Sequence, residues 1–265
     1  MEFIFLPSAI RYIMKIKIME PAINGDLGRS VITDQLVTDE IKHRIPVTAE
    51  LAVVSIGIAL LLAIPLGVTA GYRQGTRVDQ SISAMAQFLL SIPSFIVGLI
   101  LIYFLSIRLR WLPATGWTRL TESVTGNIKS VIMPAVSLAL TEIAVYTRIV
   151  RSDMINTLKE TYVLSAKSKG LKDRFILFRH ALRPSSLTLT TIVGLNIAGL
   201  IGGTVVIEQL FALPGLGKRL LDAIFQRDFI MVQGVTVFMA CVYVVINTLV
   251  DIFYMVIDPR IRRKS

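Results

Sequence analysis

Five long apolar runs alternate with shorter charged segments along the chain. The runs cover approximately residues 51–72, 82–107, 131–150, 185–207 and 229–250. About 20 apolar residues in a helix suffice to cross the hydrocarbon core of a bilayer. A bilayer offers no partner to an unpaired peptide group, so each run is expected to be helical. The pattern therefore predicts an all-α fold, a polytopic membrane helix bundle with five visible spans.

The composition supports a membrane environment. Of the 265 residues, 54% are hydrophobic and the mean hydropathy is +0.67, which is more apolar surface than a soluble domain buries. The net charge of +10 is carried by the short segments between the runs, where Lys and Arg orient a membrane protein and contact lipid headgroups. We therefore expect membrane lipid, and no nucleic acid, as a partner.

Basic residues are denser on one side of the predicted membrane. The segments 73–80, 148–185 and 258–265 hold more than half of the 28 Lys and Arg residues in a shorter total length than the segments between them. The positive-inside rule then places these three segments in the cytoplasm. The sequence is thus divided into three parts. Residues 1–46 are an N-terminal extracytoplasmic segment, residues 47–258 are a transmembrane domain with a cytoplasmic loop at 151–184, and residues 259–265 are a cytoplasmic tail.

Residues 161–184 form a basic, amphipathic stretch between two apolar runs. Two apolar stripes at helical spacing meet there, Met154, Leu158, Tyr162 and Ala166 before Gly170, and Leu171, Phe175, Phe178 and Leu182 after it. Glycine takes a positive φ at little cost, so Gly170 is expected to end the first helix and turn the chain. Pro184 interrupts the second helix. The sequence predicts two short helices that meet at this glycine.

The stretch resembles a known loop in the order of its residues: Tyr162-Val163, Ala166, Lys169-Gly170-Leu171 and then Arg179-His180-Ala181-Leu182-Arg183. It is similar to the cytoplasmic EAA loop of the membrane-spanning subunits of binding-protein-dependent ABC importers, in the dipeptide, oligopeptide and nickel branch. Leu164 and Ser165 stand where the general pattern has Glu and Ala, a departure common in the peptide branch. The resemblance implies coupling to an ATP-binding subunit through Tyr162, Ser165, Ala166, Lys167, Lys169, Gly170 and Leu171.

A second resemblance to the same family lies after the fourth run. The family has the pattern Val-x-Glu-x-x-Phe-x-x-Pro-Gly-Leu-Gly. This sequence matches it with Val206, Glu208, Phe211, Pro214, Gly215, Leu216 and Gly217. The resemblance implies an extracytoplasmic loop where a solute-binding protein docks, through Phe211, Pro214, Gly215 and Gly217; a plain re-entrant connector is the alternative. Residues 25–30, 45–51 and 258–262 also match family patterns, and the family has a first transmembrane helix before residue 25 that this sequence does not display.

Polar residues inside apolar runs are candidates for lining a translocation path, namely Ser91, Pro93, Glu142, Asn196 and Glu208. A carboxylate at the depth of Glu142 is costly, so it is expected to face the bundle interior, a water-filled path or a cationic partner. Ser91, Asn196 and Glu142 are equally compatible with a helix-packing hydrogen bond, and for Pro93 a packing kink is favoured over contact with the solute.

The sequence contains neither a GxxxxGK[ST] phosphate-binding loop nor a metal-ligand spacing, so no catalytic residue and no metal site are expected. The resemblance implies a non-catalytic permease subunit of an ATP-driven importer, with peptides as the expected solute, in the bacterial or archaeal cytoplasmic membrane. It implies no cofactor in this chain, with ATP and Mg at partner subunits. The implied partners are a second, related permease subunit in a heterodimer, two ATP-binding subunits and an extracytoplasmic solute-binding protein.

Two other classes stay open from the residues alone. A secondary transporter driven by an ion or proton gradient would use Glu142, Glu208 and Asp251 as coupling carboxylates. It requires a carboxylate near the middle of the bilayer, and only Glu142 lies deep in a run. A membrane scaffold without transport activity is the third class.

Overall fold

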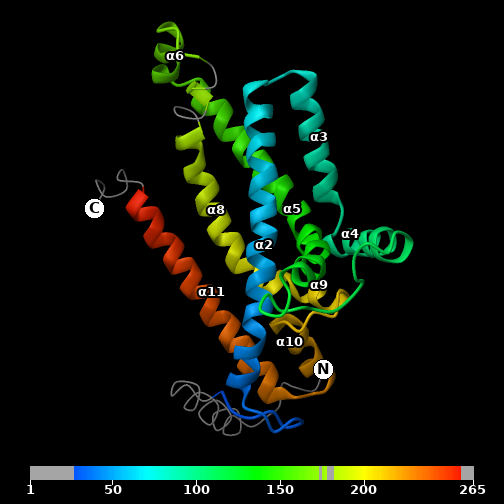
Figure 1. Cartoon of the computed structure of the whole chain (residues 1–265). Helices are drawn as coiled ribbons and strands as arrows, with labels where there is room; N and C mark the ends of the chain where they lie inside the picture. The colour runs from blue at the N-terminus through cyan, green and yellow to red at the C-terminus, as the bar shows by residue number, and fades with distance from the viewer. Residues whose placement is uncertain (1–26, 173–174, 178–181, 258–265) are drawn as a thin grey trace, which may run out of the picture.

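The computed structural model describes residues 27–172, 175–177 and 182–257 (Figure 1). Apart from one isolated β-bridge, every regular element in these residues is a helix, so the all-α prediction is confirmed. The elements are α2 (Val37–Tyr72), α3 (Arg77–Ser91), α4 (Ser94–Leu101), the π-helix η1 (Ile102–Arg108), α5 (Val124–Leu158), α6 (Thr161–Ser168), α8 (Leu182–Gly203), α9 (Val205–Leu210), α10 (Leu216–Phe225) and α11 (Phe229–Ile257).

Helices α2 and α5 pack closely along the centre of the bundle. Small residues recur at every fourth position of α2, at Ala59, Ala63, Gly67 and Gly71. A Cβ added at Gly67 would lie 2.6 Å from Cβ of Val150, and one added at Gly71 would lie 2.6 Å from Cβ of Met154. The absence of side chains at these two positions therefore lets the backbones of α2 and α5 approach, as in other membrane helix pairs.

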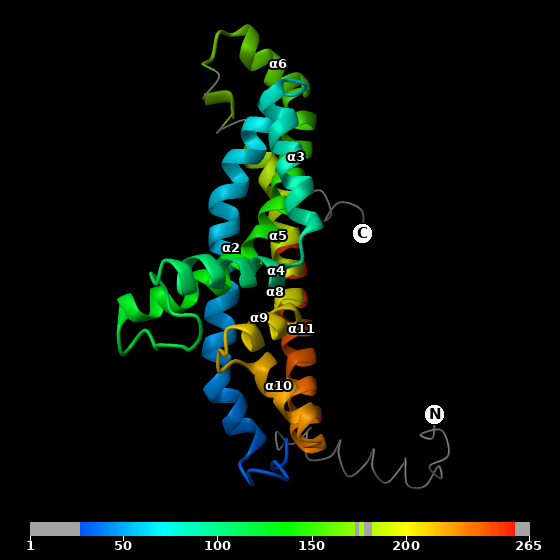
Figure 2. The same ribbon diagram turned by 90° about the vertical axis from the view of Figure 1, so that its right-hand side faces the viewer.

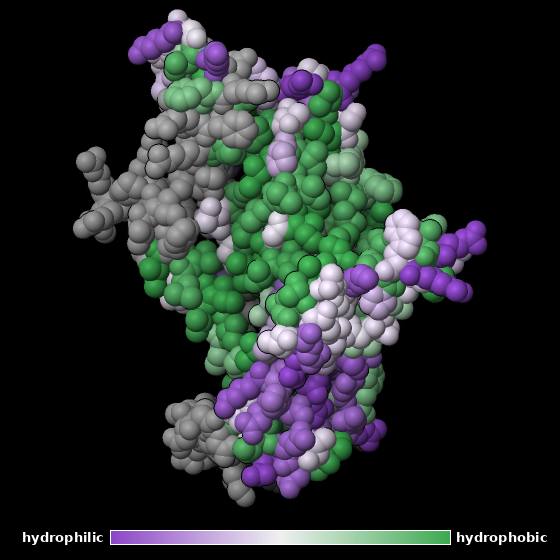
Figure 3. Space-filling view, viewed as in Figure 1, coloured by the Kyte–Doolittle hydropathy of each residue, from purple (hydrophilic) through white to green (hydrophobic). Residues whose placement is uncertain are grey.

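Three helices are long and apolar enough to cross a membrane: α2, α5 and α11 up to Val250. Helix α8 contributes a shorter apolar segment, Thr188–Ile197. Figure 3 shows a broad hydrophobic belt around the middle of one face, with hydrophilic residues gathered above and below it. We call the end that carries α6 and the α2–α3 turn the inner end, and the end that carries residues 27–36 and α10 the outer end, following the charge pattern.

The predicted span over residues 82–107 is not one continuous helix. It is broken at Pro93, where a kink was expected, and the helices on either side have the length and composition of a membrane span only when taken together. Helix α3 ends at Ser91, and α4 with η1 continues after a bend of 93°, so that they leave the bundle sideways (Figure 2). Proline cannot donate a backbone hydrogen bond and disfavours helical geometry in the residue before it. Ile92 is accordingly extended, with φ −102° and ψ 119°, and Pro93 becomes the cap of α4 instead of a kink within one helix.

Two further boundaries differ from the predicted ones. Helix α2 begins at Val37, ahead of the predicted span that starts at residue 51, and keeps Pro46 inside it. The predicted stripe from Met154 to Ala166 is interrupted, because α5 ends at Leu158 and α6 begins at Thr161. The amide of Lys159 bonds back to Asn156 and Thr157, which closes α5 before the stripe is complete.

Candidate functional site

Gly170 turns the chain at the inner end as predicted. Its φ is +74°, and only Lys169 separates it from the end of α6. The amide of Leu171 donates to the carbonyl of Ala166 at 3.3 Å, and that of Lys169 donates to Ser165 at 3.1 Å. A bond spanning five residues around a left-handed glycine is the Schellman ending of a helix. A Cβ at Gly170 would meet nothing within 4 Å, so the need for glycine here is conformational.

The chain around Gly170, of which the structure describes residues 161–172 and 175–177, forms an elbow with a small core of its own. Val163, Ala166 and Ile176 are buried together there. Three large apolar side chains point outward instead: Tyr162 is 44% exposed, Leu171 39% and Phe175 46%. Among the predicted coupling residues, Ala166 therefore faces inward, whereas Ser165 and Lys169 are exposed with Tyr162 and Leu171. Phe178, residues 179–181 and the side chain of Lys167 lie outside what the structure describes.

A partly buried ion pair fixes the helices beneath the elbow. Arg151 near the end of α5 donates to Asp79 of α3 twice, from Nε to Oδ1 at 2.5 Å and from Nη2 to Oδ2 at 2.8 Å. Asp79 also accepts from the amide of Gly75 at 2.9 Å. Two parallel bonds of this kind are strong and directional. Asp79 and Arg151 were not predicted, although an acidic residue in a basic loop is a signal that a partner is required.

The structure brings together two of the five residues predicted for the path. Asn196 of α8 donates from Nδ2 to Oε2 of Glu142 in α5 at 2.6 Å and to the hydroxyl of Tyr146 at 3.3 Å. Ser91 and Pro93 lie apart from them, exposed at the bend between α3 and α4. The Glu142 carboxylate thus joins α5 to α8.

The fifth predicted path residue, Glu208, is fully buried in α9. Its Oε1 accepts from the hydroxyl of Thr48 at 2.8 Å, and its Oε2 accepts from the amide of Lys218 at 2.9 Å. The same hydroxyl accepts from the amide of Leu216 at 2.9 Å. The Glu208 carboxylate therefore faces the loop that follows it. Its hydrogen bonds hold the first residues of α10 in place.

The loop after Glu208 is wrapped tightly around that carboxylate. A Cβ added at Gly215 would overlap the Glu208 carboxyl group, and one added at Gly217 would lie 2.6 Å from the Cα of Val205. Among the residues predicted for docking, Phe211, Gly215 and Gly217 are buried, and Pro214 is exposed. The two glycines are therefore required by close packing within the loop.

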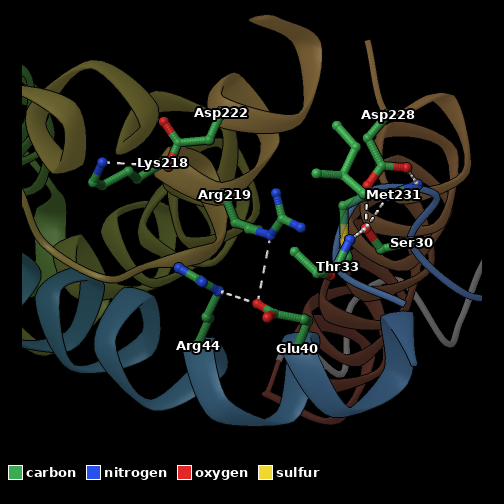
Figure 4. Close-up of polar contacts among 10 residues, drawn as sticks. Ser30, Thr33, Glu40, Arg44, Lys218, Arg219, Asp222, Asp228 and Met231 are labelled. Carbon is green, nitrogen blue, oxygen red and sulfur yellow. Dashed lines mark hydrogen bonds and ion pairs between the residues drawn. The ribbon is translucent and has the colours of Figure 1, made fainter. Parts of the chain in front are cut away.

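A second polar network closes the outer end (Figure 4). The hydroxyl of Ser30 donates to Asp228, which also accepts from the amide of Met231 at 3.2 Å. Burial alone would raise the pKa of Asp228, but hydrogen bonds from the Ser30 hydroxyl and the amides of Met231 and Val31 lower the pKa below its usual value. Residues 27–36 are thereby held against the start of α11.

Arg219 of α10 lies beside this network. Its Nε is 3.5 Å from Oε2 of Glu40, which also accepts from Nε of Arg44 at 2.7 Å. Arg219 is buried, and its Nη2 has no partner among the described residues. Sequence reasoning missed the Arg219–Glu40 contact, because it joins residues far apart in the chain.

The chain matches a protein-family model over residues 63–263. The family is described as "Binding-protein-dependent transport system inner membrane component". This match covers most of the chain, including the elbow and the loop after Glu208.

Curated relatives point in the same direction. The oligopeptide transport system permease protein AppB of Bacillus subtilis is 40% identical over 95% of this chain and 80% of the relative. A putative peptide transport system permease protein of Brucella abortus is 39% identical over 89% of this chain and 76% of the relative. The oligopeptide transport system permease protein OppB of Escherichia coli is 35% identical over 90% of this chain and 76% of the relative.

Solved structures share the fold at low sequence identity. A chain of the MetNI methionine ABC transporter in an inward-facing conformation superposes with a TM-score of 0.69 at 14% identity, covering 83% of this chain and 96% of that one. A chain of an amino acid ABC transporter gives a TM-score of 0.60 at 12% identity, covering 82% of this chain and 94% of that one. These two comparisons support the architecture of the bundle.

Proposed function

Because this chain belongs to the family of binding-protein-dependent transport system inner membrane components, we propose that it is the permease subunit of an ATP-driven peptide importer in a bacterial cytoplasmic membrane. It forms the translocation path with a related permease subunit and receives solute from an extracytoplasmic binding protein. The chain itself carries out no chemistry. Its relatives named for peptide and oligopeptide transport favour peptides as the solute.

The elbow carries this proposal. Tyr162, Leu171 and Phe175 expose apolar surface at the end that the charge pattern places in the cytoplasm, where water makes such exposure unfavourable. An amphipathic helix of this kind fits an apolar groove on a partner. Two ATP-binding subunits, which hold ATP and Mg, supply the groove and pull on the elbow when they close.

The Asp79–Arg151 pair supports transmission of that movement. It links α3 to the last turns of α5, immediately before the elbow. A displacement of the elbow is therefore passed to two membrane helices together. A flexible connection at this point would absorb the displacement instead.

Reconstitution with the partner subunits tests the proposal. The complex is placed in proteoliposomes, and peptide uptake is measured with ATP and Mg or with a proton gradient alone. We expect uptake only with ATP. Uptake driven by the gradient without ATP would favour a secondary transporter, in which Glu142 is the deep carboxylate.

A matched pair of variants tests the role of the elbow. Tyr162→Asp puts a charge on its exposed apolar face and is expected to abolish co-purification of the ATP-binding subunit. Val31→Asp puts the same charge on an exposed apolar residue at the outer end, 72% exposed, and is expected to leave co-purification unchanged. Equal retention of the ATP-binding subunit by both variants would contradict the assignment.

A further inference from the structure

An open groove follows the outer half of α2. One part has a volume of about 680 Å³ and an adjoining part about 370 Å³, and both are lined by His43, Val47, Trp117 and Arg119. On the α2 side, Asp39, His43, Pro46 and Glu50 recur at spacings of four, three and four, which is one face of a helix. The second wall of the smaller part is the segment 117–121, and the larger part is lined in addition by residues 29 and 34–36 and by Pro214.

Hydrogen bonds to the bundle hold the second wall in place. The amide of Gly116 donates to the carbonyl of Phe211 at 3.1 Å. The carbonyl of Thr118 accepts from Nδ2 of Asn127, a buried side chain of α5, at 2.9 Å. Trp117 and Arg119 flank Thr118, so their positions in the groove are determined by the fold.

The groove contains charges of both signs that are not used within the chain. Glu40 and Arg44, in the larger part, are paired at 2.7 Å. By contrast, the side chains of Glu50 and Arg119, which both line the smaller part, have no hydrogen bond or ion pair to any residue that the structure describes. Glu50 is half-buried, where an unpaired carboxylate is costly. A ligand with one positive and one negative group would satisfy both residues.

We propose that this groove is a peptide-binding site at the outer mouth of the path, in which Glu50 binds the terminal ammonium group and Arg119 binds the terminal carboxylate of a short peptide. The inference rests on the proposed function and names the site where the solute is first held. Trp117, which lines the same part of the groove, offers an apolar surface for a side chain, as in other small-molecule sites.

The dimensions of the groove fit a short peptide. A volume of 370 Å³ lies within the range of about 300–1,000 Å³ typical of small-molecule pockets. From Asp39 to Glu50 the helix rises roughly 16 Å at about 1.5 Å per residue. Four extended residues at about 3.4 Å each cover nearly this length. A dipeptide is therefore held in the smaller part, and longer peptides extend into the larger part.

Glu50 belongs to the segment 45–51, which matches a family pattern, and its side chain has no structural role within the described residues. In the segment 45–51, Thr48 is used inside the protein, where it bonds to Glu208. Glu50 is two positions further along the helix and lines the groove instead. The same turn of α2 therefore anchors the outer loop with one side chain and presents a carboxylate to the groove with another.

Direct binding to the permease complex, without the solute-binding protein, tests the proposal. The probe is radiolabelled Ala-Phe, added to the full complex of permease and ATP-binding subunits in lipid nanodiscs, with N-acetylated and C-amidated Ala-Phe as competitors. We expect saturable binding of Ala-Phe to the unaltered complex and weak competition by either blocked peptide. Glu50→Gln and Arg119→Gln should each weaken binding about tenfold or more, because each removes a charge-assisted contact.

The affinities of the two variants should also respond differently to blocking of each end of the peptide. Arg119→Gln should no longer distinguish free from amidated peptide, and Glu50→Gln should no longer distinguish free from acetylated peptide. Glu122→Gln and Arg108→Gln, exposed charges on the same side that do not line the groove, serve as controls and should bind as the unaltered chain does.

Three results would overturn the inference: no saturable binding of Ala-Phe, equal binding by both groove variants and the controls, or a loss of affinity that is the same for free and blocked peptides. If the groove variants weaken binding of the solute-binding protein and leave free Ala-Phe unaffected, the groove is a docking surface and the proposal is wrong. ATP-dependent uptake by the unaltered complex is measured in parallel, because its absence would contradict the proposed function itself.

Discussion

The outer and inner ends of the bundle use their side chains in opposite ways. At the outer end, Glu208 and Asp228 are buried carboxylates that accept hydrogen bonds from segments distant in sequence. At the inner end, the described part of the elbow buries only a small cluster of three aliphatic side chains and exposes Tyr162, Leu171 and Phe175. The two outer carboxylates are therefore satisfied within the chain, whereas the elbow presents a surface for another protein to cover.

This contrast predicts that stability and coupling are separable by mutation. Substitutions around the outer carboxylates remove interactions that nothing else replaces, so they should lower the free energy of unfolding. Substitutions in the elbow should change the interaction with partners and leave the bundle intact.

The largest loss of stability is expected for Gly215→Ala. The new methyl group would overlap the Glu208 carboxyl and displace it from Thr48 and Lys218. Overpacking together with a broken buried network should cost about 3 kcal/mol or more. Thermal unfolding of the purified protein in detergent measures the loss. Gly57→Ala is the control, because a Cβ there meets nothing within 4 Å, and an equal loss in both variants would contradict this explanation.

A smaller effect is expected for Asp79→Asn at the inner end. The change removes the charge that Arg151 contacts through two nitrogen atoms. Because the Arg151 side chain is 31% exposed, solvent compensates part of the loss, and about 1–2 kcal/mol is expected. Asp39→Asn, which breaks an exposed pair at 3.9 Å with Lys42, should have no measurable effect in the same unfolding experiment. Similar values for the two variants would show that the Asp79–Arg151 pair is not structural.

The Ser30–Asp228 contact should make stability depend on pH. The pKa of Asp228 is lower in the folded protein than its ordinary value near 4, so this contribution is complete above about pH 4 and is lost as the pH falls further. Ser30→Ala removes one of the hydrogen bonds, which should cost about 1 kcal/mol at neutral pH. It should also reduce the loss on acidification. Unfolding temperatures of both proteins across this pH range would show unchanged slopes if the contact were unimportant.

The smallest effect on stability is expected for Gly170→Val. A β-branched residue disfavours φ +74°, but the space around this position is open and the elbow lies at the end of the bundle. The unfolding temperature should therefore hardly change, and membrane insertion should be normal. ATP hydrolysis should become uncoupled from peptide uptake in proteoliposomes, because the exposed apolar side chains are redirected. Normal uptake by this variant would remove the glycine turn from the coupling mechanism.

The sequence predicted those features that depend on local chemistry. The turn at Gly170 follows from a glycine at the end of an amphipathic stripe, and the break at Pro93 follows from the restrictions of proline. The 93° bend was not predictable, because its size depends on what α4 packs against. A Cβ at Gly98 would lie 2.6 Å from Leu210, so α4 rests on a helix more than 100 residues later.

The candidate sites divide in the same way. The elbow was predicted from one contiguous stretch, and Glu142 and Asn196 were singled out by polarity in apolar surroundings. Their mutual contact, the pairing of Glu208 with Thr48 and the burial of Asp228 required the fold, since each joins segments that are adjacent only in space. Polarity along a sequence shows that a residue requires a partner, and it does not identify that partner.

The two tight helix pairs of the bundle determine where it can change shape. Gly67 and Gly71 lock α2 against α5, and Gly194 locks α8 against α11 at Val250 so closely that sliding within either pair would create clashes. Between the pairs, α5 and α8 meet at Glu142, Tyr146 and Asn196. We therefore expect any tilt of α8 and α11 relative to α2 and α5 to take place at this polar seam.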